Sequence, residues 1–358
     1  MPPAKKAKPP AKTAAPAQPR YCAQPPPSEP VLPPGLGAPR LEAILTTSKK
    51  WLNGTVLHYC FLQRPQWTWP EAQKAVVRKA FATWKGLGIG LSFKEVTKES
   101  EAEITIGRMQ DNRSWSFVGT DVLHNRDFGR TMNFGWDLTT VWGGATAIHE
   151  IGHTLGMQHE HQNPLAGIVW NEEEVYVDLA QTNGWDKETT FHNIIRKLPS
   201  NTISGSKWDP ASVMHYPFRP GLIKAPKPYD TKGVGDNTKL STLDAKWAKH
   251  WYPGLKKPKP ILPMTLKPIA AAAGAQHDFV FEPDATREYT VQTVGKADSR
   301  IVLFEERDGV PRHLAAADDA GFDDNATIRT KLVDGRRYFL RVRTHYADGT
   351  EPLGLLLK

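Results

Sequence analysis

Residues 147–161 read AIHEIGHTLGMQHEH, and the rest of the chain is best read outward from this stretch. On a helix, His149 and His153 are four residues apart and therefore project from the same face. Two imidazoles in that arrangement can bind one Zn²⁺ ion at Zn–N distances of about 2.0–2.1 Å. Glu150 follows the first histidine and is expected to face the same cleft, where its carboxylate can take a proton from a metal-bound water. The spacing predicts a metal-binding helix over roughly 142–156.

A third histidine completes the predicted site. Gly156 can adopt a positive φ without a Cβ penalty, so the helix can end there and the chain can turn sharply. This turn brings His159 round as the third ligand. Three neutral histidines leave a fourth coordination position open, which is typical of a catalytic rather than a structural zinc site. The pattern H-E-x-x-H-x-x-G-x-x-H should arise by chance on the order of 10⁻⁴ times per chain, which disfavours a helix of ordinary core histidines.

A second motif, Ser-Val-Met-His-Tyr at 212–216, supports the first from a distance. With both motifs present, the chain resembles the metzincin zinc proteases and, among them, is most similar to the astacin family. The resemblance implies that Met214 forms a hydrophobic base under the zinc site. It also implies that Tyr216 is a retractable fifth ligand, which swings to hydrogen-bond the tetrahedral intermediate. From the residues alone, Tyr216 could equally be an ordinary buried phenol.

The function that the resemblance implies is zinc-dependent cleavage of proteins or peptides by an endopeptidase. Zinc supplies an activated water and polarises the scissile carbonyl, and Glu150 moves the proton to the leaving amine. The substrate is expected to lie extended along an edge strand. The stretch RTMNFGW (130–136), just before the predicted metal-binding helix, is our candidate for that edge.

The sequence also departs from the family pattern. Astacins usually continue past the third histidine with an Arg and an Asp-Arg-Asp run, whereas this chain has His-Gln-Asn-Pro at 161–164. Animal astacins carry two disulfides, which two cysteines cannot make. In the family, the counterpart of Glu160 anchors the mature N-terminus. We expect His161 to be a solvated loop residue and His215 to be a structural hydrogen-bonding residue in the turn around Met214.

Residues 1–40 differ in composition from the rest of the chain. They hold 13 of the 30 prolines, and six basic side chains against one acid. Such a stretch cannot bury enough apolar surface to offset its ordering entropy, so we expect a disordered tail and a candidate propeptide. The tail carries +5 of the formal charge of +8, which leaves +3 for the body of the chain. A near-neutral body gives no reason to expect a nucleic-acid partner.

The sequence also bears on where the protein works. No run approaches about 18 consecutive apolar residues, so no transmembrane segment is expected. The basic N-terminus is not followed by the apolar stretch of about 7–15 residues that marks a secretory signal. Because related proteases work mainly outside cells, the resemblance implies an extracellular protein. We expect it to be a monomer.

Residues 41–253 are predicted to form an α+β metzincin-type domain, in which a mixed β-sheet accompanies the zinc-binding helix. Strands are expected at 51–62, 91–96, 103–109, 115–123 and 130–136, and further helices at 69–85, 186–197 and 240–253. Ser241 can cap the last of these helices, with Asp244 three residues on.

A linker of Pro and Lys is predicted at 254–263, and short alternating segments fill 264–358. These segments predict an all-β sandwich or jelly roll. The stretch from YTVQTVGKADSRIVLFEERDG to RRYFLRV resembles the prepeptidase C-terminal domains of bacterial secreted proteases. An acidic cluster in this part could bind Ca²⁺, since clustered carboxylates suit a hard cation, or it could be a polar loop tip. The cluster consists of Asp318, Asp319, Asp323 and Asp324.

Cys22 lies in PRYCAQPPP (19–27), ahead of the predicted catalytic domain. A thiolate is a good zinc ligand, at about 2.3 Å, and the prolines could hold the segment extended along the substrate groove. Some metzincins stay latent through a cysteine in an Arg- and Pro-containing propeptide, and Arg20 and Pro25 give a loose likeness to it. A latency switch is therefore one of three interpretations of Cys22, and the sequence does not decide among them. The alternatives are a disulfide with Cys60 and a free surface thiol; Cys60 itself is expected to be a small buried hydrophobe.

Two other classes of function remain as alternatives. The first is a catalytically silent adhesion or carbohydrate-binding protein on a metzincin fold, and the intact Glu150 argues against it. The second is a nucleic-acid binder that uses residues 1–20, but no aromatic residues are interleaved with the lysines there.

Overall fold

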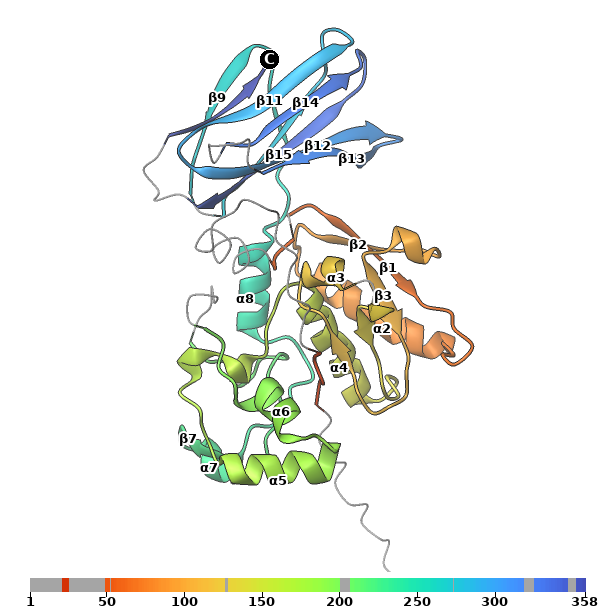
Figure 1. The fold of residues 1–358 in the computed structure, drawn as a ribbon, viewed down its shortest axis with the longest axis vertical. Helices are drawn as coiled ribbons and strands as arrows, with labels where there is room; N and C mark the ends of the chain where they lie inside the picture. The colour runs from red at the N-terminus through yellow and green to blue at the C-terminus, as the bar shows by residue number, and fades with distance from the viewer. Residues whose placement is uncertain are drawn as a thin grey trace, which may run out of the picture. The chain divides into compact units, whose positions relative to one another are not determined.

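A computed structural model of the chain describes residues 21–25, 49–51, 53–125, 128–199, 207–272, 274–318, 325–346 and 352–358. The described residues fall into two compact units (Figure 1). One unit gathers 21–25, 58–84 and 94–247, and the other gathers 49–57, 85–93 and the part from 248 onward. The division at 41–253, 254–263 and 264–358 stays a prediction, and most of the predicted tail lies outside the described residues.

A mixed five-stranded sheet lies in the first part of the chain, as predicted. Its strands, in spatial order, are β2 (Ser92–Glu95), β1 (Val56–Phe61), β3 (Ile104–Gly107), β5 (Met132–Asn133) and β4 (Trp115–Ser116). Strands β1, β3 and β5 pair in parallel, whereas β4 is antiparallel to β5. The edge strand is therefore β4. Our assignment of the edge to 130–136 was wrong, because β4 covers the outer side of β5.

The strand expected at 115–123 is also shorter than predicted. It ends at Ser116, and residues Asp121–His124 form a helical turn, α3. Gly119 has a φ of +53° and donates its N–H to the His153 carbonyl at 2.8 Å. A positive φ redirects the chain, so the segment leaves the sheet and packs against the metal-binding helix.

The helix at the centre of the sequence analysis is α4 (Val141–Thr154), and α2 (Glu71–Lys85) packs against it. Val77, Phe81 and Trp84 form the buried face of α2, and the Trp84 indole N–H donates to the Ile148 carbonyl of α4 at 2.9 Å. This hydrogen bond joins α4 to α2.

The remaining elements of this part surround the site. They are the helices α5 (Glu172–Asn183), α6 (Lys187–Thr190) with a π-helical turn at Phe191–Ile195, α7 (Tyr229–Lys232) and α8 (Thr242–Trp251), the 3₁₀ turns Glu99–Glu101, Glu160–Gln162 and Pro164–Ala166, and the strand pair β6 (Val169–Trp170) and β7 (Ile223–Ala225). At α8 the predicted cap is present, because Ser241 and Asp244 each accept the other's backbone N–H, at 2.8 and 2.9 Å. Among the described residues, no helix is both long and apolar enough to cross a bilayer.

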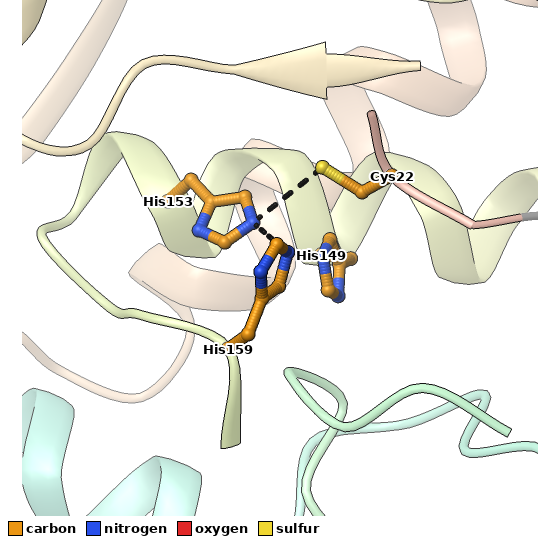
Figure 2. A group of neighbouring side chains, drawn as sticks. All are labelled: Cys22, His149, His153 and His159. Carbon is orange, nitrogen blue, oxygen red and sulfur yellow. Dashed lines mark hydrogen bonds between the residues drawn. The ribbon is translucent and has the colours of Figure 1, made fainter. Parts of the chain in front are cut away.

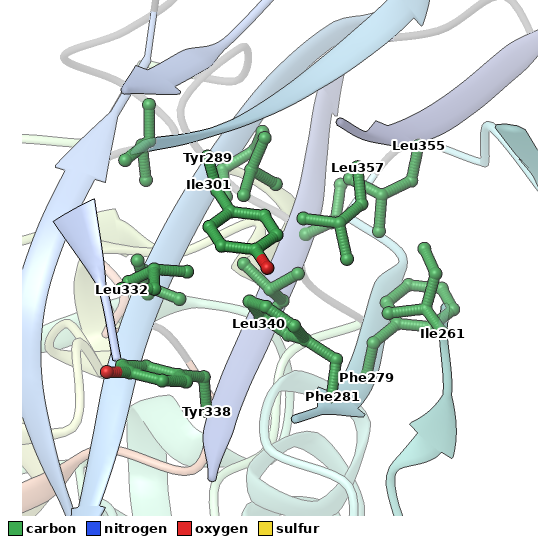
Figure 3. Close-up of a cluster of buried hydrophobic side chains, with 14 of the residues drawn as sticks. Ile261, Phe279, Phe281, Tyr289, Ile301, Leu332, Tyr338, Leu340, Leu355 and Leu357 are labelled. Carbon is green, nitrogen blue, oxygen red and sulfur yellow. The ribbon is translucent and has the colours of Figure 1, made fainter. Parts of the chain in front are cut away.

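The last part of the chain forms the predicted all-β sandwich. One sheet has the order β13 (Val310–Ala317), β12 (Asp298–Arg307), β15 (Tyr338–Tyr346), β10 (Gln276–Phe281), β8 (Lys259–Pro260), and the other has β14 (Thr327–Leu332), β11 (Arg287–Gly295), β16 (Leu353–Leu357), β9 (Thr265–Ile269). Alternate side chains from both sheets, among them Phe279, Tyr289, Leu340 and Leu357, meet in one core (Figure 3). Such a core is the usual way in which two twisted sheets bury their inner faces.

The calcium cluster predicted in this sandwich falls largely outside the described residues. Asp319, Asp323 and Asp324 are not described. The carboxylate of Asp318 pairs with the Arg300 guanidinium at 2.6 Å.

Candidate metal centre

Helix α4 presents two histidines to one buried centre. Thr140 begins the helix by accepting the Gly143 N–H on its side-chain oxygen at 2.9 Å. His149 and His153 lie further along the helix, about one turn apart, and both are buried. After the helix ends, Gly156 has a φ of +93° and donates its N–H to the His153 carbonyl at 2.8 Å. This is the turn that the sequence predicted, and it carries His159 to the same centre.

Backbone carbonyls orient the first two imidazole rings. His149 Nδ1 lies 2.8 Å from the Val213 carbonyl oxygen, and His153 Nδ1 lies 2.7 Å from that of Met157. A carbonyl can only accept, so both Nδ1 atoms carry the proton and each Nε2 keeps its lone pair. Within the described part of the chain, His149 Nε2 has no hydrogen-bond partner. The orientation is that of metal-ligating histidines, whose second nitrogen is commonly bound to a carbonyl or carboxylate.

Four potential ligand atoms converge. The nitrogens of His149, His153 and His159 and the sulfur of Cys22 all lie within 4.8 Å of one another (Figure 2). The closest two, the Nε2 atoms of His153 and His159, are 3.0 Å apart. Burial lowers the pKa of His149 to about 4, and it lowers the pKa of His153 and His159 well below the usual value. Three nitrogens with one sulfur, buried and this close together, suit Zn²⁺.

Glu150 lies next to the four potential ligands but is not one of them. Its carboxylate Oε2 accepts a hydrogen bond from the Cys22 thiol at 3.5 Å, and its Oε1 has no partner among the described residues. The side chain is buried, and this burial raises the pKa of its carboxyl group. A carboxylate next to the open side of a metal centre is suitably placed to move a proton there.

The turn at 212–216 packs against α4 next to the three histidines. Met214 is buried against Gly152 of α4, where a Cβ on that glycine would collide with the Met214 sulfur. Asp244 holds the turn, because its two carboxylate oxygens accept from the Ser212 hydroxyl at 2.6 Å and from the Val213 N–H at 2.9 Å. The sequence marked Asp244 only as a helix cap, and no local pattern pointed to this second role.

Tyr216 brings a phenol into the centre. Its O–H donates to the carbonyl oxygen of Cys22 at 2.7 Å, and the same oxygen lies 2.7 Å from His159 Nε2. The structure therefore places the phenol next to both a predicted metal ligand and a peptide carbonyl. The role of a retractable fifth ligand stays a prediction for Tyr216.

Two of the neighbouring side chains need comment. We predicted a solvated His161, and this was wrong. The 3₁₀ turn at Glu160–Gln162 buries the ring, and His161 Nε2 donates to the Asn193 carbonyl at 2.8 Å. His215 behaves as expected, because its Nδ1 lies 2.6 Å from the Tyr216 carbonyl oxygen within the turn.

The side chain of Glu160 is held close to its own turn. One of its carboxylate oxygens accepts from the Asp209 N–H at 2.9 Å and from the Asn163 amide at 3.1 Å. Burial raises its pKa to about 7.

The described tail residues 21–25 lie along the edge strand. Cys22 pairs in parallel with Ser114, and the Ala23 N–H donates to the Ser114 carbonyl at 2.9 Å. On the other side, the Gln24 N–H donates to the Asn193 side-chain oxygen at 3.1 Å. Cys22 and Cys60 are both buried and are not joined by a disulfide, so Cys22 does not lie at the surface.

The fold and the site together define the metzincin class of metallopeptidase folds. Their features are a mixed sheet, two histidines on α4, a third after a glycine turn and a methionine-containing turn beside them. More specifically, the chain belongs to the astacin family of peptidases, whose family model matches residues 43–253. The predicted family is thereby confirmed.

Individual relatives agree with this assignment. Protein SpAN of the sea urchin Strongylocentrotus purpuratus is 24% identical over 194 residues, which are 51% of this chain but only 29% of SpAN, so the chain spans less than a third of that relative. The solved structure of myroilysin is 31% identical and covers 57% of this chain and 96% of its own, with a TM-score of 0.51. The pre-peptidase C-terminal domain of a Bacillus anthracis collagenase is 17% identical over 29% of this chain and 97% of its own, and its TM-score of 0.25 is too low to support any argument.

Proposed function

We propose that the protein is an endopeptidase that cleaves peptide bonds at the His149–His153–His159 centre, and that Cys22 holds it latent. The observation that carries the proposal is a peptide already lying in the site. The carbonyl of Cys22 accepts a hydrogen bond from Tyr216, while its thiol faces Glu150 and the three histidines. The chain continues on both sides of Cys22, as a substrate cleaved in its interior would.

When bound, Zn²⁺ would supply Lewis-acid polarisation and an activated water. The chain itself supplies the proton transfer. The Cys22 sulfur occupies the space between Glu150 and the histidine nitrogens, so a water in place of the sulfur would lie within reach of the carboxylate. Glu150 can accept its proton and return it to the leaving amine.

Tyr216 is proposed to stabilise the charge that develops on the scissile carbonyl. Its O–H already donates to a peptide carbonyl, that of Cys22, at 2.7 Å. A donor aimed at this position gains strength when the oxygen becomes an oxyanion. The same geometry therefore serves a substrate carbonyl once the tail has left.

The substrate backbone is proposed to take the path of residues 21–25. The Ser114 carbonyl next to β4 accepts one backbone N–H, and the Asn193 side chain accepts the next one from the opposite side. An extended peptide alternates its N–H groups in this way. These two acceptors need no particular side chain, so they suit protein substrates in general.

Metal removal tests the proposed function. We expect the full chain carrying Cys22→Ser to cleave casein, to lose this activity in 1,10-phenanthroline and to regain it on addition of Zn²⁺. A second variant, Cys22→Ser with His153→Ala, should bind less than one Zn²⁺ per chain by metal analysis and should stay inactive. Cleavage that survives the chelator, or undiminished zinc in the His153→Ala variant, would contradict the proposal.

Tyr216→Phe tests the oxyanion role, again in the Cys22→Ser chain. The ring still fills its buried position, so we expect the protein to fold and to keep its zinc. Loss of one donor to the transition state should lower kcat by about 10²–10³-fold and leave KM nearly unchanged. Steady-state kinetics on a peptide substrate provides the measurement. An effect confined to KM would exclude the assigned role.

A further inference from the structure

A pocket next to the metal centre holds the side chain of Tyr21. Tyr21 is only 2% exposed. Its ring centroid lies 5.2 Å from that of Tyr216, 6.0 Å from Phe218 and 6.1 Å from Trp185, and it is nearly parallel to Phe218 at 24°. Its O–H donates to the Pro217 carbonyl at 3.0 Å. The pocket therefore meets both the aromatic face and the hydroxyl of a tyrosine.

The residues that form the walls of this pocket are held in place by contacts that do not involve residues 21–25. Gly184 ends α5 with a φ of +66°, and the following Trp185 N–H donates to the Leu179 carbonyl at 3.2 Å. Phe218 exchanges both of its backbone hydrogen bonds with Val234, at 2.9 and 2.8 Å. Because these contacts do not involve residues 21–25, the pocket should persist when the tail leaves.

The position of the pocket relates it to the bond that is cleaved. Tyr21 directly precedes Cys22, whose carbonyl and thiol lie at the catalytic groups. A side chain in this pocket thus belongs to a residue next to the one at the centre. Because the Cys22 carbonyl takes the place of the scissile carbonyl, that residue is the second one on the N-terminal side of the scissile bond.

We propose that the pocket walled by Trp185, Phe218 and the Pro217 carbonyl is a specificity subsite that selects substrates with tyrosine immediately before the residue that supplies the scissile carbonyl. The proposal rests on the proposed endopeptidase function and adds the class of substrate. Burial of the ring favours aromatic side chains over small ones. The Pro217 carbonyl favours tyrosine over phenylalanine, since phenylalanine would leave a partly buried acceptor without its hydroxyl partner.

The charges around the pocket disfavour an acidic occupant. Burial raises the pKa of the Tyr21 phenol, and the carboxylates of Asp178 and Asp236 raise it further, against the single guanidinium of Arg219. Arg219 is itself paired with Asp178 at 2.6 Å. The remaining field is negative, so aspartate and glutamate should be poor residues at this position.

The test uses the full chain carrying Tyr21→Ala and Cys22→Ser, which leaves the pocket open. Reduced, unfolded casein is digested, and the cleavage sites are identified by mass spectrometry. We expect tyrosine to be enriched at the second position on the N-terminal side of the cleaved bond. In matched synthetic peptides, tyrosine at that position should exceed alanine by about 10- to 200-fold in kcat/KM and phenylalanine by about 2- to 10-fold.

A pocket variant sharpens the test. Adding Trp185→Ala should reduce the preference for tyrosine over alanine, whereas Trp142→Ala, an exposed tryptophan on α4, should leave it unchanged. If Trp185→Ala fails to fold, the cleavage profile of the chain carrying Tyr21→Ala and Cys22→Ser still tests the subsite. Cleavage without tyrosine enrichment would overturn the subsite and leave the endopeptidase function standing. Absence of any cleavage would instead overturn the proposed function itself, and the subsite with it.

Discussion

Glu150→Gln, introduced into the Cys22→Ser chain, is expected to lower kcat by about 10²–10⁴-fold, the usual contribution of a positioned general base. Glutamine has the shape of the carboxylate and keeps an acceptor oxygen, but it cannot take up a proton. The side chain is buried, and burial already disfavours its charged form. We therefore expect the variant to be at least as stable as its parent, so the loss reports proton transfer and not unfolding.

The measurement pairs steady-state kinetics with metal analysis. The Glu150→Gln chain should keep one Zn²⁺, because the ligand atoms come from the histidines. Glu173→Gln, which changes an exposed carboxylate on α5, is the matched control and should behave like its parent. A kcat within about twofold of the parent would show that Glu150 is not the base, and it would favour a different proton acceptor or a binding role.

Cys22→Ser is expected to convert an inactive full chain into an active one. The Cys22 sulfur lies 3.7 Å from His153 Nε2 and is buried, so it blocks the position that water needs. A tethered ligand acts at a local concentration of roughly millimolar. If a free peptide of this kind bound with a micromolar Kd, tethering would suppress activity by about a hundredfold or more. Serine lacks the thiolate that zinc prefers, so the substitution removes most of this block.

The experiment compares full-length proteins under reducing conditions. The unaltered chain should be nearly inactive, and it should gain activity when Cys22 is alkylated or the tail is clipped. Cys60→Ala is the matched control, because it also removes a buried thiol but should leave the chain latent. Equal activity of the unaltered and Cys22→Ser proteins would end the latency proposal.

Much of the metal centre could be predicted because the pattern that encodes it is local. His149 and His153 share a helix face whatever surrounds them, and Gly156 permits the turn toward His159 on its own. The Ser241 and Asp244 cap of α8 is local in the same sense. The alternating segments of the sandwich predicted its strands, since each strand shows one face to the core (Figure 3).

Our predictions were wrong where contacts between residues far apart in the chain determine the local structure. Nothing in 130–136 reveals that β4 pairs outside β5, because edge position is a property of the whole sheet. His161 is buried because distant residues meet at its ring: the π-helical turn brings Asn193 to it, and Tyr216 and Phe218 pack beside it.

The sequence by itself determined that His149 and His153 share one helix face and that the chain turns at Gly156 toward His159, because helix periodicity and glycine's freedom at positive φ act within a few residues. Only the tertiary structure decided which strand forms the edge, that Asp244 supports the turn under the metal centre, and that Trp185 and Phe218 form a pocket for Tyr21. Those features depend on contacts between residues far apart in the chain, and the spacing of residues along a sequence does not encode which distant segments pack together.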